Sequence, residues 1–305
     1  MRRVLLTGAT GFIGRHCIAP LIGRGYEVHA VSTKAIASTP EVCWHRGDLL
    51  GTSAVDVLMD RVRPTHLLHL AWYTEHGAFW ISPENLRWVE ASLVLLRAFA
   101  RVGGQRVVMA GSCAEYDWAG GVCSESTTPL QPRTLYGVCK DALRAVSAAY
   151  AASAGLSSSW GRVFFLYGPH ERPGRLVSSV ISALLAGRTA ECSHGNQIRD
   201  FLHAEDVASA LVAILDSTAE GAVNVASGLP VSIRDLVNTI ADRIGAQELV
   251  RFGVAKTNPD DPAVLVADTQ RLRSEVGWSP RYTLDQGVER TIAWWRDHIA
   301  SEPRS

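Results

Sequence analysis

The sequence predicts an α/β protein built on a doubly wound parallel sheet, accompanied by a smaller, irregular α/β portion. Short runs rich in β-branched residues alternate with helical stretches through the first half of the chain. Such alternation is typical of βαβ units, in which right-handed helical crossovers join parallel strands. The chain has 305 residues, 47% of them hydrophobic, and shows no fixed-period repeat and no low-complexity linker. It therefore has enough apolar material for a sizeable core.

The elements of this alternation can be placed in chain order. The expected strands are Arg3–Thr7, Glu27–Val31, Thr65–Leu70, Gln105–Ala110 and Ser157–Phe165. The expected helices are Phe12–Gly23, Val55–Arg63, Pro83–Val102, which starts with a proline as helices often do, and the alanine-rich Leu135–Ala154. After Tyr167 the pattern loosens into turns, including Thr257–Pro262. We therefore expect residues 1–165 to form the sheet domain, residues 196–226 to return to it, and residues 166–305 to form mainly the smaller portion.

The charges and cysteines exclude several classes of protein. The chain has 30 Lys and Arg against 30 Asp and Glu, which argues against a nucleic-acid-binding domain with its basic excess. No apolar run approaches the about 20 residues that span a bilayer, and the apolar start is too short for a secretory signal. The six cysteines lack the spacing of a disulfide framework or a zinc site. We expect a cytoplasmic protein with free thiols, no metal, and no nucleic-acid or membrane partner.

A glycine-rich turn joins the first expected strand to the first expected helix. Gly8, Gly11 and Gly14 follow the spacing G-x-x-G-x-x-G, one residue wider than G-x-G-x-x-G, with Phe12 and Ile13 before the last glycine. Glycines at this junction allow a tight turn and bring the backbone close to a pyrophosphate, whose charge a helix N-terminus favours. The turn therefore predicts a dinucleotide site.

The end of the second strand bears on which dinucleotide binds. It continues as Ser32-Thr33-Lys34, without the carboxylate that would hydrogen-bond the adenosine ribose hydroxyls. Lys34, together with Arg15 just after the last glycine, suits a 2′-phosphate instead. We therefore favour NADP(H), with NAD(H) as the alternative in which both cations are solvated surface charges.

Three further residues indicate proton and hydride chemistry. Tyr136 and Lys140 lie four residues apart in an expected helix and therefore share a face. With seven tyrosines and three lysines in the chain, this spacing is rare by chance. A nearby ammonium favours the phenolate, which suits a tyrosine for acid–base work. Ser112 follows the strand Gln105–Ala110 at its carboxyl end, where ligands bind in parallel sheets, and can hydrogen-bond a reacting oxygen.

Together these motifs resemble the extended short-chain dehydrogenase/reductase superfamily, in its NAD(P)-dependent nucleotide-sugar epimerase, dehydratase and reductase branch. The matching residues are Gly8, Gly11 and Gly14 of the glycine motif and Ser112, Tyr136 and Lys140 of the Ser/Tyr/Lys triad. The resemblance extends over nearly the whole chain, to Val276-Gly277-Trp278-Ser279-Pro280 near its end. It implies a Rossmann-type fold, a nucleotide-linked sugar as substrate, and a homodimer formed through the helices Pro83–Val102 and Leu135–Ala154.

The resemblance also assigns roles to the triad and the cofactor-lining residues. Tyr136 exchanges a proton with a sugar oxygen, Lys140 binds the nicotinamide ribose, and Ser112 holds the substrate oxygen while hydride passes to or from the nicotinamide. The cofactor supplies the hydride chemistry, whereas the protein supplies orientation and electrostatics.

Further positions are expected to line the cofactor and the sugar. Asp48, followed by Leu49, resembles the aspartate that contacts the adenine. Leu70 and Ala71 resemble the end of the strand that lines the cofactor. Trp72 opens an aromatic cluster that could wall the sugar pocket or be plain core or subunit contact.

The residues after Ser112 bear on the reaction. Sugar-nucleotide 4,6-dehydratases carry an Asp-Glu pair there, where this chain has Cys113 and Ala114. Enzymes resembling GDP-fucose synthase carry an epimerising cysteine at the position of Ala114. Neither reaction is favoured, so a 4-epimerase and a 4-ketoreductase remain. Ser32-Thr33-Lys34 favours an NADPH-dependent reductase of a nucleotide-linked 4-keto-6-deoxy sugar. A non-catalytic dinucleotide sensor is least favoured, because it has no need of a Tyr–Lys pair.

Two arginines in the second half are expected to contact the substrate. Arg199 matches the family arginine that holds the nucleotide diphosphate, a role that suits a planar guanidinium. The alternative is a surface ion pair with Asp200 or Glu205. The family often has a second arginine in an Arg-Pro-Gly-Asp run, which here reads Asn258-Pro259-Asp260-Asp261. Arg175 could compensate for this loss.

Overall fold

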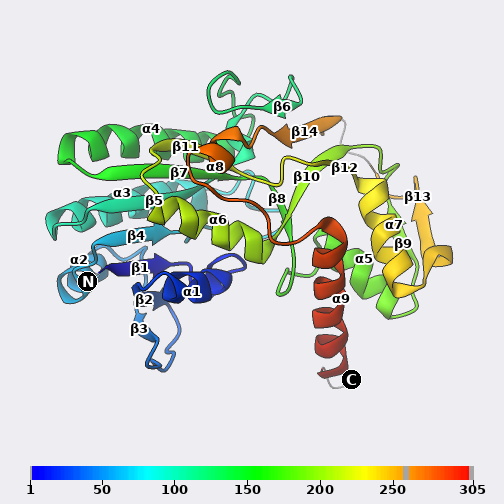
Figure 1. Ribbon diagram of the computed structural model, residues 1–305, viewed down its shortest axis with the longest axis horizontal. Coiled ribbons are helices and arrows are strands. Elements are labelled where there is room, and N and C mark those ends of the chain that lie inside the picture. Colours follow the sequence, from blue (N-terminus) through cyan, green and yellow to red (C-terminus); the bar gives the residue numbers. More distant parts are fainter. Residues whose placement is uncertain (1, 257–260, 302–305) are drawn as a thin grey trace.

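A seven-stranded parallel sheet forms the larger part of the computed structural model, which describes residues 2–256 and 261–301 (Figure 1). Its strands are β1 (Arg3–Thr7), β2 (Glu27–Ser32), β3 (Val42–Arg46), β4 (His66–His69), β5 (Arg106–Ser112), β7 (Ser157–Val163) and β11 (Gly221–Val225). They lie in the order β11-β7-β5-β4-β1-β2-β3, and every neighbouring pair is parallel. The predicted doubly wound α/β fold is therefore confirmed.

Helices cover both faces of this sheet. They are α1 (Gly14–Gly23) and α6 (Ala204–Asp216) on one face, and α2 (Thr52–Val62), α3 (Glu84–Arg101) and α4 (Leu135–Ala154) on the other. Side chains alternate along β1, so Val4 and Leu6 pack with α1 and α6 whereas Leu5 packs with α2 and α3. Both faces are buried, which explains the nearly continuous apolar runs of the strands.

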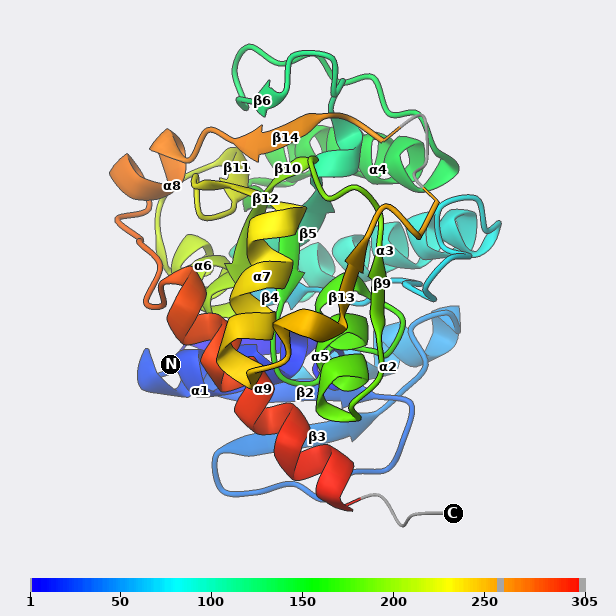
Figure 2. The ribbon, with the colours of Figure 1, turned by 90° about the vertical axis from the view of Figure 1, so that its right-hand side faces the viewer.

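The smaller portion contains two further sheets and three helices around a core of their own (Figure 2). Its strands are β6 (Val122–Cys123), β8 (Phe165–Tyr167), β9 (Ala190–Cys192), β10 (Ile198–His203), β12 (Pro230–Ser232), β13 (Val250–Phe252) and β14 (Val264–Ala267). The helices α5 (Leu176–Leu185), α7 (Ile233–Ile244) and α9 (Leu284–Ser301) pack together, and α8 (Gln270–Ser274) lies near β11. The short 3₁₀ helices are η1 (Cys113–Glu115) and η2 (Gln247–Leu249).

Local signals explain where the predicted elements hold and where they shift. Helix α4 begins and ends as predicted, because Thr134 caps its N-terminus and Gly155 takes the left-handed conformation that ends it. Helix α1 starts only at Gly14, since the preceding residues form the glycine turn. The predicted strand Ser157–Phe165 is divided between β7 and β8, which pair in different sheets.

Two more expectations concern the whole chain. All six cysteines lie in the described part and carry free thiols, as predicted. Within residues 2–256 and 261–301, no helix combines the length and apolar character needed to cross a bilayer.

Candidate active site

The order of the strands in the seven-stranded sheet brings the predicted motifs together. Strands β5, β4, β1 and β2 are adjacent and parallel, so their carboxyl ends meet at one edge. The glycine turn follows β1, Leu70 and Ala71 follow β4, and Ser112 ends β5. This edge is where ligands bind in open parallel sheets.

The glycine turn is packed so closely that Gly8 and Gly14 have no room for a side chain, and a ligand would meet the backbone of the turn directly. Gly8 has a φ of +68°, and a Cβ there would lie 2.8 Å from the amide nitrogen of Ala71. A Cβ on Gly14 would collide with the carbonyl oxygen of Gly8, and the Gly11 amide donates to that same oxygen at 2.9 Å. No side chain caps the N-terminus of α1, the end of a helix that favours an anion. The turn fits the pyrophosphate of a dinucleotide.

A buried hydrogen-bond chain fixes the neighbouring end of β4. Thr7 Oγ1 accepts from the Leu70 amide at 3.1 Å and bonds His69 Nδ1 at 2.7 Å. His69 Nε2 bonds Ser92 Oγ at 2.8 Å, and Ser92 Oγ donates to the Trp88 carbonyl. Ser92 thus gives its proton away and accepts from His69, so Nε2 carries the imidazole proton. Burial lowers the pKa of His69 to about 3, which keeps the ring neutral. The sequence offered no sign of this role for His69.

The residues expected around the adenosine lie at the end of β2 (Ser32 and Lys34) and just after β3 (Asp48 and Leu49). Ser32 is buried and its hydroxyl accepts from the Lys34 amide at 3.0 Å, while the Lys34 side chain is exposed. Asp48 is exposed and its carboxylate accepts from the Leu50 amide, whereas Leu49 packs into the core.

Arg15 lies beside the glycine turn. Its guanidinium donates to the carbonyls of Thr10 at 2.8 Å and Gly11 at 3.2 Å. Arg15 therefore braces the turn in this structure, and its charge is held near the place where a dinucleotide would carry phosphates.

Ser112, Tyr136 and Lys140 converge where α4 crosses the end of β5. The Ser112 hydroxyl lies close enough to the Tyr136 phenol to oppose the rise of its pKa. Lys140 is buried, and its Nζ donates to the Ala110 carbonyl at 2.9 Å. The structure thus brings together the three residues that the sequence singled out, from two elements that are separate in the chain.

Aromatic rings surround the phenol and the ammonium. Lys140 Nζ lies 3.6 Å from the ring centroid of Trp72, a cation–π contact. Phe79 and Trp80 meet Tyr136 edge to face, with centroids 5.0 and 5.7 Å away. Trp72 is itself fixed by a hydrogen bond from its Nε1 to Asn85 Oδ1 at 2.8 Å. Low-polarity walls of this kind strengthen electrostatic effects within the site.

Burial decides the protonation of the Tyr–Lys pair in this structure. It raises the pKa of the Tyr136 phenol, while the nearby Ser112 hydroxyl and the charge of Arg175 oppose this. Burial also lowers the pKa of Lys140 to about 7, with Glu115 opposing. The sequence suggested that the ammonium would lower the pKa of Tyr136. Here Lys140 points to Ala110 and Trp72 instead, so desolvation dominates.

A fully buried carboxylate supports Ser112 from behind. Glu115 accepts from the Ser112 amide at 2.7 Å and from Trp160 Nε1 at 2.9 Å. It also forms an ion pair with Arg162, whose Nε lies 2.7 Å from the carboxylate. Arg162 in turn donates to the Tyr116 hydroxyl at 2.9 Å. The only sequence signal for this network is the position of Glu115 three residues after Ser112.

The two substrate arginines differ in their surroundings. Arg199 is 2% exposed and pairs with Asp261 at 2.6 Å. Within the described residues the carboxylate that pairs with Arg199 is therefore not one of the two considered from the sequence, Asp200 and Glu205. Asp200 instead accepts from the Ser227 and Gly228 amides. Arg175 is half-buried at the start of α5, and its charge reaches Tyr136. Residues 258–260 of the run that departs from Arg-Pro-Gly-Asp lie outside the described residues.

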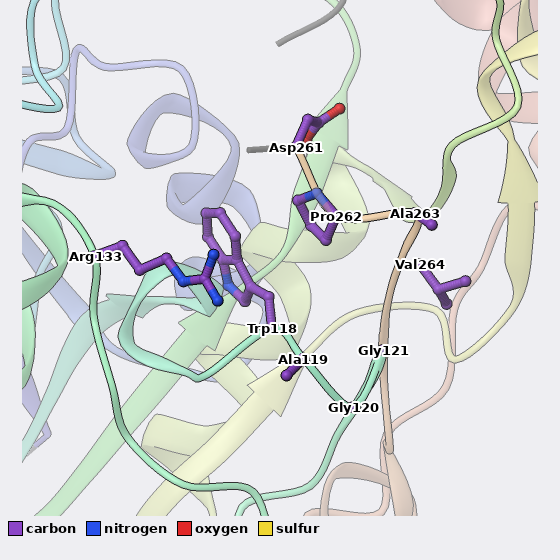
Figure 3. Close-up of a pocket in the computed structure, with 9 residues that line it drawn as sticks. All are labelled: Trp118, Ala119, Gly120, Gly121, Arg133, Asp261, Pro262, Ala263 and Val264. Carbon is purple, nitrogen blue, oxygen red and sulfur yellow. The ribbon is translucent and has the colours of Figure 1, made fainter. Parts of the chain in front are cut away.

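A pocket of about 510 Å³ adjoins the Arg199–Asp261 pair (Figure 3). It is lined by Trp118, Ala119, Gly120, Gly121, Arg133, Asp261, Pro262, Ala263 and Val264. Ser112, Tyr136 and Lys140 are absent from the lining, so this pocket does not contain the triad.

Comparisons with known proteins cover almost the whole chain. Residues 4–226 match the NAD dependent epimerase/dehydratase family. UDP-glucose 4-epimerase from Rhizobium meliloti (strain 1021) is 26% identical over 321 residues, covering 95% of this chain and 96% of that protein. The structure of MoeE5 in complex with UDP-glucuronic acid and NAD is 33% identical, has a TM-score of 0.85, and matches 98% of this chain and 100% of that one.

A second solved structure agrees with the first. UDP-glucose 4-epimerase from Thermus thermophilus, in complex with NAD, is 27% identical with a TM-score of 0.82. The match covers 96% of this chain and 99% of that one. With the glycine turn and the Ser/Tyr/Lys group in place, the chain belongs to the NAD-dependent epimerase/dehydratase family, in the nucleotide-sugar branch that its motifs predict.

Proposed function

We propose that this protein is a nucleotide-sugar 4-epimerase that retains NAD. The observation that carries the proposal is that the buried Lys140 lies beside the Tyr136 ring and bonds the Ala110 carbonyl, two residues before Ser112, at the sheet edge next to the glycine turn. This arrangement suits proton exchange with a hydroxyl that is oxidised and reduced again. When bound, NAD supplies the hydride acceptor and donor.

The surroundings of Ser112 argue against a dehydratase. Water elimination needs an acid and a base beside the sugar, but Cys113 and Ala114 are buried and neither is a carboxylate. Glu115 is held by Trp160 and Arg162 and is 0% exposed. Burial also raises the pKa of the Cys113 thiol to about 12, which argues against an epimerising thiolate.

Each residue of the triad has a defined task in this proposal. Tyr136, acting as the phenolate, takes the proton of the sugar hydroxyl as hydride leaves and returns it afterwards. Ser112 orients the sugar oxygen beside the phenol. Lys140, fixed by Ala110 and Trp72, orients the ribose next to the nicotinamide and supplies positive charge. Arg175 and Arg199 would hold the diphosphate, for which Arg199 must exchange Asp261 for phosphate oxygens.

The relatives favour NAD as the cofactor. MoeE5, at 33% identity, and the Thermus thermophilus 4-epimerase were both solved with NAD. The guanidinium of Arg15 is occupied with the carbonyls of the glycine turn. Ser32 remains at the end of β2 as a hydroxyl that can bond a ribose hydroxyl.

The second candidate is an NADPH-dependent 4-ketoreductase. It rests on Ser32-Thr33-Lys34, because the exposed ammonium of Lys34 suits a 2′-phosphate. A reductase consumes NADPH and releases NADP, whereas an epimerase returns the hydride to the same sugar.

One experiment separates the two candidates. The nucleotide released on denaturing the purified protein is identified, and the protein is then incubated with UDP-glucose or UDP-glucuronic acid and followed by NMR. We expect co-purified NAD and conversion to the 4-epimer without added or consumed NADPH. Bound NADP, or NADPH oxidation with a 4-keto sugar and no epimer, would overturn the epimerase in favour of the reductase.

We also propose a homodimer formed through α3 and α4. These two helices pack side by side, and exposed apolar residues lie on both: Leu86 on α3, and Val138 and Val146 on α4. Val138 and Val146 are eight residues apart and share a helix face.

Light scattering after size exclusion tests the dimer. The wild type is expected to have twice the mass of one chain, and Leu86→Glu with Val146→Glu is expected to give monomers. Leu229→Glu, at an equally exposed apolar residue outside these helices, should remain dimeric. A monomeric wild type would refute the proposal.

A further inference from the structure

Three potential metal ligands gather on strands β2 and β3, away from the triad. One ring nitrogen of His29, one ring nitrogen of His45 and the sulfur of Cys43 all lie within 4.8 Å of one another. His29 pairs in register with Cys43, and Val31 pairs with His45. Residues two apart on a strand share a face, so the two strands place all three side chains together. Both strands lie at the end of the sheet next to α1 in Figure 1, and β3 is its edge strand.

A carboxylate orients the first of these ligands. His29 Nε2 bonds Glu27 Oε1 at 2.9 Å, and the other Glu27 oxygen pairs with Arg3 Nε at 3.0 Å. Because a carboxylate accepts, Nε2 of His29 carries the proton and Nδ1 presents its lone pair. Carboxylate–histidine pairs of this kind fix the tautomer of metal-binding histidines and raise their basicity.

The lone pair of His29 faces the second histidine. His29 Nδ1 lies 2.8 Å from His45 Nε2, so a proton on His45 now bridges the two nitrogens. A zinc ion bound at about 2.0–2.1 Å from each nitrogen would take the place of this proton after a modest separation of the rings.

The thiol completes a donor set suited to zinc. Cys43 is half-buried, and two imidazoles with one thiolate match the borderline-soft preference of Zn²⁺. We propose that His29, Cys43 and His45 form a site for one Zn²⁺ ion, with Glu27 as the orienting carboxylate. On binding, the Cys43 thiol loses its proton to solvent, the proton of His45 moves to Nδ1, and solvent fills the fourth position. The ion would tie the edge strand β3 to β2, whose end lies at the expected adenosine site.

Metal titration tests the site without relying on enzyme activity. The purified full-length protein is freed of metal with a chelator and titrated with Co²⁺, followed by absorption, and with Zn²⁺, followed by calorimetry. We expect one ion per chain and a thiolate-to-cobalt charge-transfer band that Zn²⁺ abolishes. Cys43→Ser and His45→Ala should each weaken Zn²⁺ binding at least tenfold, and Glu27→Gln by about tenfold through loss of the orienting bond.

The controls separate the site from chance binding. His194→Ala removes an exposed histidine elsewhere and should leave the affinity unchanged. The remaining five thiols are buried, so Cys43→Ser should abolish the charge-transfer band. Circular dichroism checks that Cys43→Ser, a nearly isosteric change, still folds. Equal affinity in the wild type and in Cys43→Ser, or no thiolate band, would overturn the proposal.

Discussion

Replacing Tyr136 with phenylalanine is expected to lower turnover by about 10²–10⁴-fold, the range for loss of a general acid–base group. The substitution removes only the hydroxyl group, and the contacts of the ring with Phe79 and Trp80 remain. The variant should therefore fold and bind nucleotide as the wild type does. Turnover is measured by NMR on UDP-glucose or by NADPH oxidation, whichever activity the wild type shows.

Tyr150→Phe is the matched control for this change. Tyr150 lies on the same helix α4, outside the triad, and its substitution should leave turnover within about twofold of the wild type. Unchanged turnover in Tyr136→Phe would contradict the assigned role. The pH profile is a second readout. Because burial raises the pKa of the phenol and Tyr136 must be deprotonated to take a proton, turnover of the wild type should rise with pH, and this rise should be absent in the variant.

The sequence predicted the fold best where local chemistry acts alone. Helix α4 carries its own cap at Thr134 and its own terminator at Gly155, so both ends were predictable. Strand β3, Val42–Arg46, was not predicted, since its short apolar run ends in the polar residues His45 and Arg46. Its pairing with β2 comes from the sheet and not from its own pattern.

The site was predictable where one motif carries it, and not where the fold joins distant residues. Tyr136 and Lys140 share a helix face by spacing alone. The Arg199–Asp261 pair links residues 62 apart, and the Glu115–Arg162 pair links residues 47 apart. Neither separation has a signature in the sequence. The same reason hid the candidate metal ligands, because Cys43 and His45 meet His29 only across a strand pair.

Glu115→Ala is expected to lower the free energy of unfolding by about 3–5 kcal/mol, the usual cost of leaving a buried charge without its partner. Arg162 would stay buried with its Nε unpaired, and the Ser112 amide and Trp160 Nε1 would lose their acceptor. Urea unfolding measures the change. Glu84→Ala is the control, since Glu84 pairs with Arg87 on the exposed surface of α3 and such pairs contribute little. A loss below about 1 kcal/mol in Glu115→Ala would contradict the prediction.

A double variant identifies the physical cause of this loss. If the unpaired guanidinium is responsible, replacing Glu115 and Arg162 together with methionine should recover much of the stability, because the buried charge is then gone. If the lost hydrogen bonds to Ser112 and Trp160 are responsible, the double variant should be as unstable as Glu115→Ala. In either case the acceptor that holds the Ser112 amide is missing. Turnover should therefore fall in both variants even where stability returns, since the serine beside Tyr136 is no longer fixed from behind.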